Sequence, residues 1–214
     1  MSAAGRQIHA VVFDLGGVLI DWNPRHLYRR LFDGDDAAME RFLTEVCAQA
    51  WNERQDAGRP FAEGVAELVA RFPDLAELIA AYDQQWEDML AGPISGSVAI
   101  LAGLRRRGIP LYALTNFSAE KFPIARRRFD FLAWFDGIVV SGEIGLIKPD
   151  PGIFRHLTAT FGLQPETTLF IDDSVHNVAG AAALGFAAVQ FLGPAQLEAE
   201  LAAFGLAPAL QDRT

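Results

Sequence analysis

Three carboxylates follow directly on two apolar runs that lie far apart in the chain. Asp14 follows the run at residues 10–13, and Asp172 and Asp173 follow the run at residues 168–171. Carboxylates gathered in a partly dry cleft repel one another, and a bound cation is the usual remedy. Mg²⁺ prefers hard oxygen ligands of this kind. The pattern therefore predicts a Mg²⁺ site in which Asp14 also serves as a nucleophile.

A hydroxyl, an amide and a lysine complete this candidate site. Thr115 and Asn116 end a third apolar run, and their polar groups suit the oxygens of a phosphoryl group. Lys148 lies in a loop between glycine and two prolines, where it would supply positive charge to a bound anion and to the nucleophile. Taken singly, each residue has a structural alternative, such as a turn or cap for Asp14 and Thr115 and a surface loop for Lys148. Taken together, they predict a metal-assisted nucleophilic enzyme.

Strand and helix patterns alternate through the region that carries these residues. After a strand within residues 8–20, further strands are predicted at 110–114, 137–140, 168–171 and 187–191. Helices are predicted between them, at 98–107, 119–128, 151–161 and 175–184. This alternation predicts an α/β fold with a Rossmann-like parallel sheet and helices on both faces. Such sheets bind ligands beyond the carboxyl ends of their strands, where Asp14, Thr115 and Asp172 fall.

Residues 22–91 interrupt this alternation with a helical pattern. Apolar residues recur at three- and four-residue spacing in four stretches, at 25–32, 37–51, 62–72 and 75–89. We therefore expect a core domain of residues 1–21 and 92–214 and an all-helical cap domain of residues 22–91, inserted over the strand ends as a lid. Trp22, Trp51 and Gln55 stand near predicted cap turns and could contact a substrate. The alternative for both tryptophans is a place in the cap core.

Composition argues against several classes of partner. The chain of 214 residues carries a net charge of −9 and shows no broad basic region, which argues against nucleic acid. No apolar stretch approaches the length of a membrane span, so no membrane partner is expected. Cys47 is the only cysteine, which excludes an internal disulfide and favours the reducing cytoplasm. The sequence carries no signal for an oligomeric state.

Four segments together resemble the motifs of the haloacid dehalogenase-like hydrolase superfamily. In chain order they read FDLGGVL at 13–19, LTN at 114–116, SGEIGLIKPDP at 141–151 and FIDD at 170–173. The resemblance covers essentially the whole chain. The helical insertion between the first two motifs is similar to the C1 cap of subfamily I. The residues within these motifs, together with Asn177 after the acidic pair, are similar to those of the branch that contains small sugar-phosphate phosphatases.

The resemblance implies a Mg²⁺-dependent phosphatase acting on a small phosphate ester, such as a sugar phosphate. Asp14 would attack phosphorus and become an aspartyl-phosphate, which water then hydrolyses. The resemblance places Mg²⁺ on the Asp14 carboxylate, the Gly16 carbonyl and Asp173, with Asp172 as a further ligand or an orienting group. It places the phosphoryl oxygens on Thr115, Asn116 and Lys148.

One position departs from the family pattern. Phosphatases of this superfamily usually carry an acid two residues after the nucleophile, and it protonates the leaving oxygen. Here that position is Gly16. General acid catalysis contributes about 10²–10⁴-fold, most of all with poor leaving groups. We therefore hypothesise a substrate with a better leaving group, such as an anomeric sugar phosphate, an acyl phosphate or an aryl phosphate.

Three other functions fit parts of the pattern. A 2-haloacid dehalogenase would use Asp14 to displace halide from carbon without a metal, but the acidic pair would repel the carboxylate of its substrate. A phospho-acceptor signalling module also combines aspartate, threonine and lysine with Mg²⁺, but its acidic pair follows the first strand and it has no helical insertion. A catalytically weakened binding or regulatory protein would fit the loss of the acid at Gly16.

Overall fold

A parallel five-stranded sheet forms the centre of the computed structural model, which describes residues 6–207. The strand order is β5-β4-β1-β6-β7, and every pair is parallel. The strands are β1 (Ala10–Phe13), β4 (Leu111–Thr115), β5 (Gly137–Val140), β6 (Thr168–Asp172) and β7 (Ala187–Gln190). The central strand β1 is buried along its whole length, as a continuous apolar run in a doubly covered sheet requires. The predicted α/β fold is confirmed.

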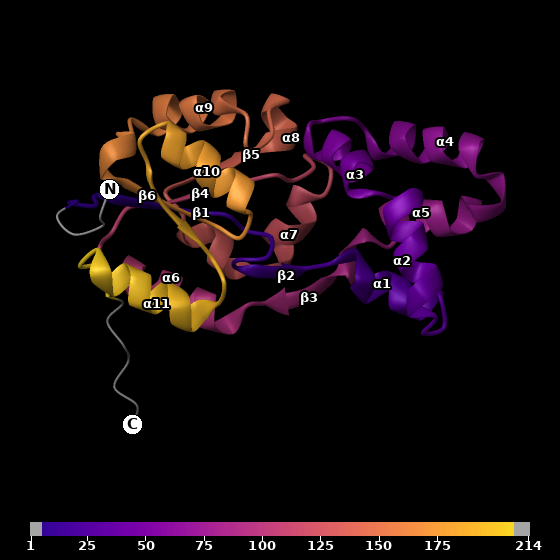
Figure 1. The fold of residues 1–214 in the computed structure, drawn as a ribbon, viewed down its shortest axis with the longest axis horizontal. Helices are drawn as coiled ribbons and strands as arrows, with labels where there is room; N and C mark the ends of the chain where they lie inside the picture. The colour runs from indigo at the N-terminus through magenta and orange to yellow at the C-terminus, as the bar shows by residue number, and fades with distance from the viewer. Residues whose placement is uncertain (1–5, 208–214) are drawn as a thin grey trace.

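Helices cover both faces of this sheet, and strand side chains alternate between two apolar clusters (Figure 1). Val11 and Phe13 join the cluster on the face of α6, α7 and α11, whereas Val12 joins the cluster on the face of α9 and α10. The flanking helices are α6 (Ser95–Arg106), α7 (Phe122–Arg128), α8 (Ser141–Ile144), α9 (Pro151–Phe161), α10 (Val175–Ala183) and α11 (Pro194–Ala203). Short 3₁₀ turns η3 (Asp130–Trp134) and η4 (Pro165–Thr167) complete the core.

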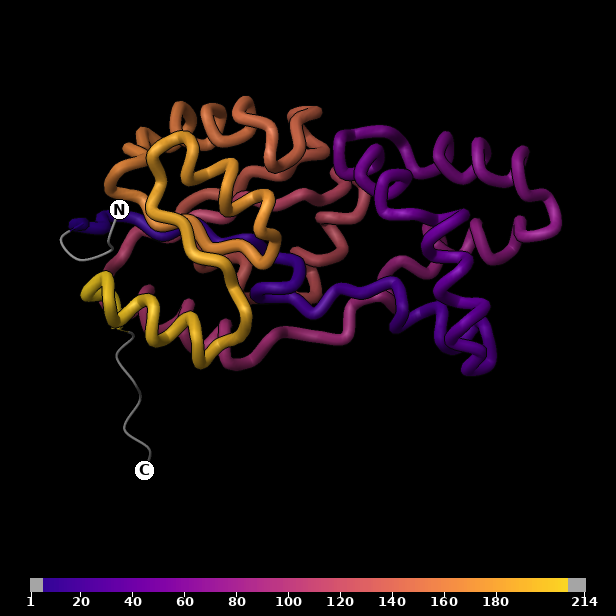
Figure 2. Tube along the Cα trace, in the orientation of Figure 1, coloured from indigo at the N-terminus to yellow at the C-terminus, as the bar shows by residue number. Residues whose placement is uncertain are grey.

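The segment 24–89 is helical and projects beside the carboxyl ends of the strands, as the indigo-to-purple tube in Figure 2 shows. We call this segment the cap. It contains α1 (Pro24–Leu31), α2 (Asp36–Glu45), α3 (Gln49–Asp56), α4 (Phe61–Arg71), η1 (Pro73–Leu75), α5 (Ala76–Gln84) and η2 (Trp86–Met89). A two-stranded antiparallel ribbon of β2 (Ile20–Trp22) and β3 (Leu90–Pro93) joins the cap to the core.

Two features of the cap differ from the sequence expectation. The helix expected at 37–51 is two helices, because Ala48 adopts an extended backbone between α2 and α3 and acts as the N-cap of α3. The helical stretch expected at 75–89 ends as α5 at Gln84 and continues only as the 3₁₀ turn η2. No helix in the described part of the chain is long and apolar enough to cross a bilayer. The cytoplasmic location stays a prediction.

Candidate active site

Sheet order brings the predicted site residues together at one edge. Strands β4, β1 and β6 are adjacent, so Thr115 at the end of β4, Asp14 just after β1 and Asp172 at the end of β6 meet at their carboxyl ends. The backbone N–H of Asp14 donates to the carbonyl of Ile171 at 2.8 Å, which ties the first motif to the fourth. Residues from distant parts of the sequence therefore share one site.

Lys148 stands between two of the carboxylates. Its Nζ lies 2.8 Å from Asp14 Oδ1 and 2.7 Å from Asp172 Oδ2, and the lysine is 3% exposed. Asn116 fixes the lysine loop, because its Oδ1 accepts from the Lys148 N–H at 2.7 Å and its Nδ2 donates to the Lys148 carbonyl at 3.0 Å. The side chain of Asn116 thus positions Lys148, and its backbone N–H is the group left for a phosphoryl oxygen.

Asp172 is a fully buried carboxylate whose contacts are made within the protein. Its Oδ1 accepts from the Ser174 backbone N–H at 2.9 Å and from Asn177 Nδ2 at 3.0 Å. Its Oδ2 accepts from Lys148. This arrangement favours the orienting role for Asp172 over the role of a metal ligand. Asp173, one residue on, is exposed and lines the cavity.

Charge in this cluster is incompletely balanced. Burial raises the pKa of Asp14 to about 7, although Lys148 acts in the opposite direction. Burial and the neighbouring Asp172 raise the pKa of Asp173 above its ordinary value. Burial alone would lower the pKa of Lys148, but Asp14 and Asp172 outweigh it and raise that pKa. One ammonium faces three carboxylates, so a further cation would stabilise the cluster.

The donor set suits a divalent cation. Asp14, Asp172 and Asp173 each offer an oxygen, and these atoms lie within 4.8 Å of one another. The turn after β1 is shaped for the approach of Asp173: a Cβ at Gly17 would lie 2.4 Å from Asp173 Oδ2, and the φ of Gly17 is 73°. Glycine is therefore required there. Hard carboxylate oxygens at this spacing fit Mg²⁺, and Asp14 and Asp173 with the Gly16 carbonyl would hold it.

Thr115 contributes an unpaired hydroxyl. Its Oγ1 is buried and has no hydrogen-bond partner among the described residues. A buried hydroxyl without a partner carries a desolvation cost, which a bound oxygen would relieve. Its place at the end of β4, beside Asp14, suits the phosphoryl contact expected from the sequence.

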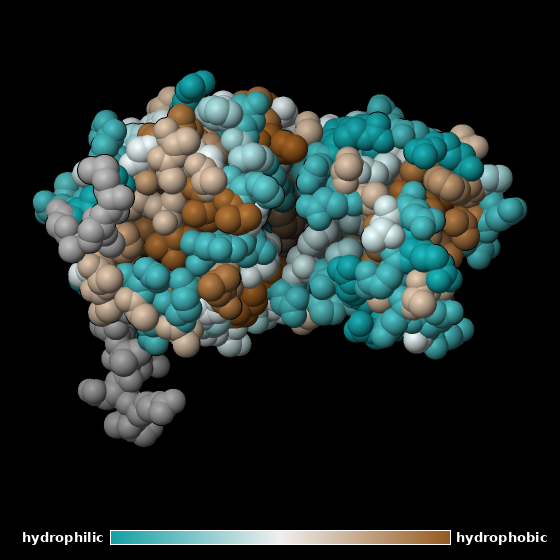
Figure 3. Space-filling model, in the orientation of Figure 1, coloured by the Kyte–Doolittle hydropathy of each residue, from teal (hydrophilic) through white to brown (hydrophobic). Residues whose placement is uncertain are grey.

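A cavity of about 970 Å³ lies between the strand ends and the cap, and Figure 3 shows the surface hollowed at this junction. The core side of the lining includes Asp14, Gly16, Asn116, Lys148 and Asp173. The cap side supplies both apolar and polar groups, including Trp22, Arg25, Leu43, Asn52, Asp56 and Tyr82. The candidate nucleophile therefore faces a cavity of a size that suits a small organic ligand.

The three cap residues expected to contact a substrate have different places. Trp22 lines the cavity, and its buried Nε1 has no partner among the described residues. Trp51 is packed in the cap core, where its Nε1 donates to the Gly64 carbonyl at 3.1 Å and its ring contacts Tyr82. Gln55 is fully buried and donates to the Trp51 carbonyl at 2.7 Å. The structure brings only Trp22 of these three to the cavity.

Asp56, which lies with Trp51 and Gln55 among the residues near a predicted cap turn, lines the same cavity. It stands one helical turn after Asn52, whose Nδ2 donates to Asp56 Oδ2 at 2.9 Å. An amide and a carboxylate four residues apart lie on the same face of a helix and can hydrogen-bond to each other. The sequence shows this four-residue spacing of Asn52 and Asp56, but the spacing does not indicate which face of α3 contacts the core.

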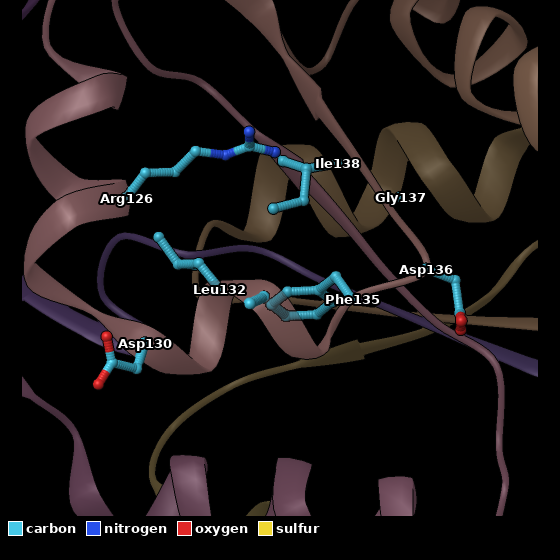
Figure 4. A pocket seen from close by; sticks show the side chains of 8 residues that line it. Arg126, Asp130, Leu132, Phe135, Asp136, Gly137 and Ile138 are labelled. Carbon is cyan, nitrogen blue, oxygen red and sulfur yellow. The ribbon is translucent and has the colours of Figure 1, made fainter.

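A second cavity, of about 470 Å³, lies beside α7 and the start of β5 (Figure 4). Arg126 extends toward Ile138 along one side, and the carboxylates of Asp130 and Asp136 lie on opposite sides. Asp136 is used by the fold, because its Oδ2 accepts from the Leu111 N–H at 2.8 Å. None of the motif residues lines this cavity, so the chemistry is assigned to the first one.

Comparison with known proteins agrees with the geometry. Residues 8–185 match the sequence model of the haloacid dehalogenase-like hydrolases. The sesquiterpene phosphatase astK of Aspergillus oryzae is 27% identical, over 82% of this chain and 86% of that protein. A phosphoglycolate phosphatase of Thiobacillus denitrificans is 26% identical, over 83% and 80%.

Solved structures show the same fold. A HAD family enzyme of Bacteroides thetaiotaomicron, in complex with magnesium and inorganic phosphate, superposes with a TM-score of 0.64. It is 25% identical, and the match covers 86% of this chain and 93% of that one. The match to the family extends over most of the chain and includes all four motifs. The chain therefore belongs to the haloacid dehalogenase-like hydrolase family.

Proposed function

We propose that this hydrolase is a Mg²⁺-dependent phosphomonoesterase that forms an aspartyl-phosphate on Asp14. The observation that carries the proposal is the fixed carboxylate of Asp14 at the floor of the cavity. The Leu15 backbone N–H donates to Asp14 Oδ1 at 2.7 Å, and Lys148 contacts the same oxygen. Both contacts fall on Oδ1, so Oδ2 is the oxygen assigned to the attack.

The proposed reaction has two steps, phosphoryl transfer to Asp14 and hydrolysis of the aspartyl-phosphate. Asp14 Oδ2 forms a bond to phosphorus while the bond from phosphorus to the ester oxygen breaks, and the electron pair leaves with that oxygen. Water then attacks phosphorus and releases Asp14 and inorganic phosphate. Lys148, the Thr115 hydroxyl and the Asn116 backbone N–H stabilise charge on the phosphoryl oxygens, and Asp172 holds Lys148 in place. Mg²⁺ held by Asp14, Asp173 and the Gly16 carbonyl would supply further positive charge to the phosphoryl group.

The substrate proposed is a small phosphorylated metabolite, with a sugar phosphate as the first class to test. The cavity is lined by the aromatic Trp22 and Tyr82, the apolar Leu43 and the polar Asn52, a mixture that suits a sugar ring. The named relatives act on other esters, so the test panel must include phosphoglycolate and a sesquiterpenyl phosphate.

Metal removal is expected to abolish the activity. Phosphate release should be followed on a panel of sugar 1- and 6-phosphates, phosphoglycolate, an acyl phosphate and a sesquiterpenyl phosphate, with Mg²⁺ and with EDTA. We expect release with Mg²⁺ and a loss of at least about 10²-fold with EDTA. Halide release from 2-haloacids should be measured beside it. Halide release that survives EDTA, without phosphate release, would replace the phosphatase by a dehalogenase.

Mg²⁺ is also expected to stabilise the fold, and Asp173 should control this effect. An ion at 100 times its Kd contributes about 2.7 kcal/mol, which corresponds to a Tm increase of about 5–10 °C for a chain of this size. Asp173→Asn should remove most of the increase, because it deletes the carboxylate that faces the cavity beside Gly17. Asp74→Asn, an exposed change in the cap, is the control. Equal Tm increases in wild type and Asp173→Asn would place the ion elsewhere.

A further inference from the structure

The site lacks a proton donor at its usual sequence position. Gly16 has no carboxyl group, so the ester oxygen would leave as an unprotonated alkoxide. The remaining carboxylates that line the cavity are Glu53, Asp56 and Asp173 besides the nucleophile Asp14. Asp173 is assigned to the cation, and Glu53 accepts from Gln49 Nε2 at 3.1 Å in an exposed pair. Asp56 is the remaining carboxyl group in the cavity lining without an assigned role.

Asp56 ends α3 at the point where the cap contacts the start of α8 in the core. Asn52 Nδ2 donates to its Oδ2 at 2.9 Å, and the backbone N–H of Ser118 acts to lower the pKa of the Asp56 carboxyl group. Its carbonyl accepts from the Ser141 hydroxyl at 2.5 Å. Ser118 lies two residues after Asn116, which holds the Lys148 backbone. A cap side chain is thereby fixed against the same loop that positions the catalytic lysine.

Glycines allow this close approach of cap and core. A Cβ at Gly58 in the cap would lie 3.0 Å from the carbonyl oxygen of Gly142 in the core, and the φ of Gly58 is 98°. Lys121 provides a second contact on the other side, with an ion pair to Asp83 and its Nζ 4.7 Å from the centre of the Phe61 ring. The position of Asp56 is thus set by backbone packing and by an ion pair rather than by a flexible loop.

The carboxyl group of Asp56 is suited to carry a proton near neutral pH. Burial, and then the neighbouring Glu53, raise its pKa to about 7, while the Ser118 N–H and Lys148 act in the opposite direction. Tyr82 faces it from α5 and stays neutral, because burial raises the pKa of that phenol well above its ordinary value. A general acid is most effective when its pKa lies near the working pH.

We propose that Asp56 is the general acid of this enzyme and takes the place of the carboxyl group that Gly16 lacks. The proposal rests on the proposed phosphatase function. In the first step Asp56 gives its proton to the leaving ester oxygen as the bond from that oxygen to phosphorus breaks, so the product leaves as a neutral alcohol. In the second step the Asp56 carboxylate takes a proton from the attacking water, which restores the starting state.

The test is the leaving-group dependence of Asp56→Asn. In the Mg²⁺-loaded protein we expect kcat for alkyl phosphates to fall about 10²–10⁴-fold and kcat for 2,4-dinitrophenyl phosphate to fall less than about threefold. The decline of wild-type activity above neutral pH should disappear in the variant. Asp74→Asn, the same chemical change at an exposed cap position that does not line the cavity, is the control and should behave as wild type. Equal losses on both ester classes, or no loss on either, would overturn the proposal.

Moving the acid back to the first motif gives an independent test. A Cβ at Gly16 would have nothing within 4 Å, and its φ is not in the left-handed region, so Gly16→Asp can be accommodated. The double variant Asp56→Asn with Gly16→Asp should recover at least tenfold in alkyl phosphate turnover over Asp56→Asn alone. If wild type cleaves only activated esters and Asp56→Asn changes nothing, the leaving-group hypothesis stands and the Asp56 proposal fails. If wild type releases no phosphate from any ester, the phosphatase function itself fails.

Discussion

Asp14→Asn is expected to lower phosphate release by at least about 10⁴-fold, the scale on which removal of a covalent nucleophile acts. An amide cannot form the covalent phosphoryl intermediate. The fold should be retained, because Lys148 keeps its partner Asp172. Phosphate release at saturating Mg²⁺, with circular dichroism on the same sample, measures both effects. Residual turnover above about one part in a hundred would assign the attack to another group.

The same variant gives a stability readout that does not depend on activity. The pKa of Asp14 is raised to about 7 from an ordinary value of 3.8, so between these values the native state holds a proton that the unfolded chain has lost. The free energy of unfolding of the wild type therefore falls as pH rises through this window. Asp14→Asn removes that contribution. In EDTA the variant should match the wild type near pH 4 and exceed it at pH 8, whereas Asp74→Asn, an exposed change in the cap, should show no such trend.

The parts of this molecule that the sequence predicts well are those set by local pattern. The strand that precedes Asp14 and the strand that ends in Asp172 are continuous apolar runs, which is what a sheet covered on both faces requires. Their carboxyl ends meet because parallel strands share one edge. The strand-end position of each acidic residue follows from these runs, whereas the adjacency of β1 and β6 is given by the strand order of the sheet.

The parts that the sequence does not predict depend on contacts between distant segments. Trp51 and Asp56 lie on the same short helix, and a helix with polar and aromatic residues on several sides does not show which side is buried. Trp51 packs into the cap, whereas Asp56 meets Ser118 of the core. Likewise, two adjacent acids look equivalent in sequence, but Asp172 is buried against Lys148 and Asp173 faces the cavity. The strand register and the loop around Lys148 decide between them.

Lys148→Met should have the largest effect on stability in the site. The change leaves Asp14 and Asp172 buried without their shared cation, and removal of one partner from a buried ion pair costs about 3–5 kcal/mol. We expect Tm to fall by about 6–20 °C and phosphate release to be lost. The fall should be smaller at pH 5 than at pH 8, because carboxylates without a cation partner take up protons more readily. Lys121→Met, whose partner Asp83 is partly exposed, should cost less.

A second substitution separates charge from packing. If the loss in Lys148→Met arises from uncompensated carboxylates, then adding Asp172→Asn should restore much of the stability, because one of the two buried charges disappears. Activity should stay absent, because no cation then faces the phosphoryl oxygens from the lysine loop. A double variant no more stable than Lys148→Met would mean that the lysine acts through packing of its side chain against Phe170. Recovery of stability without activity would show that Lys148 both balances the buried charge and serves the reaction.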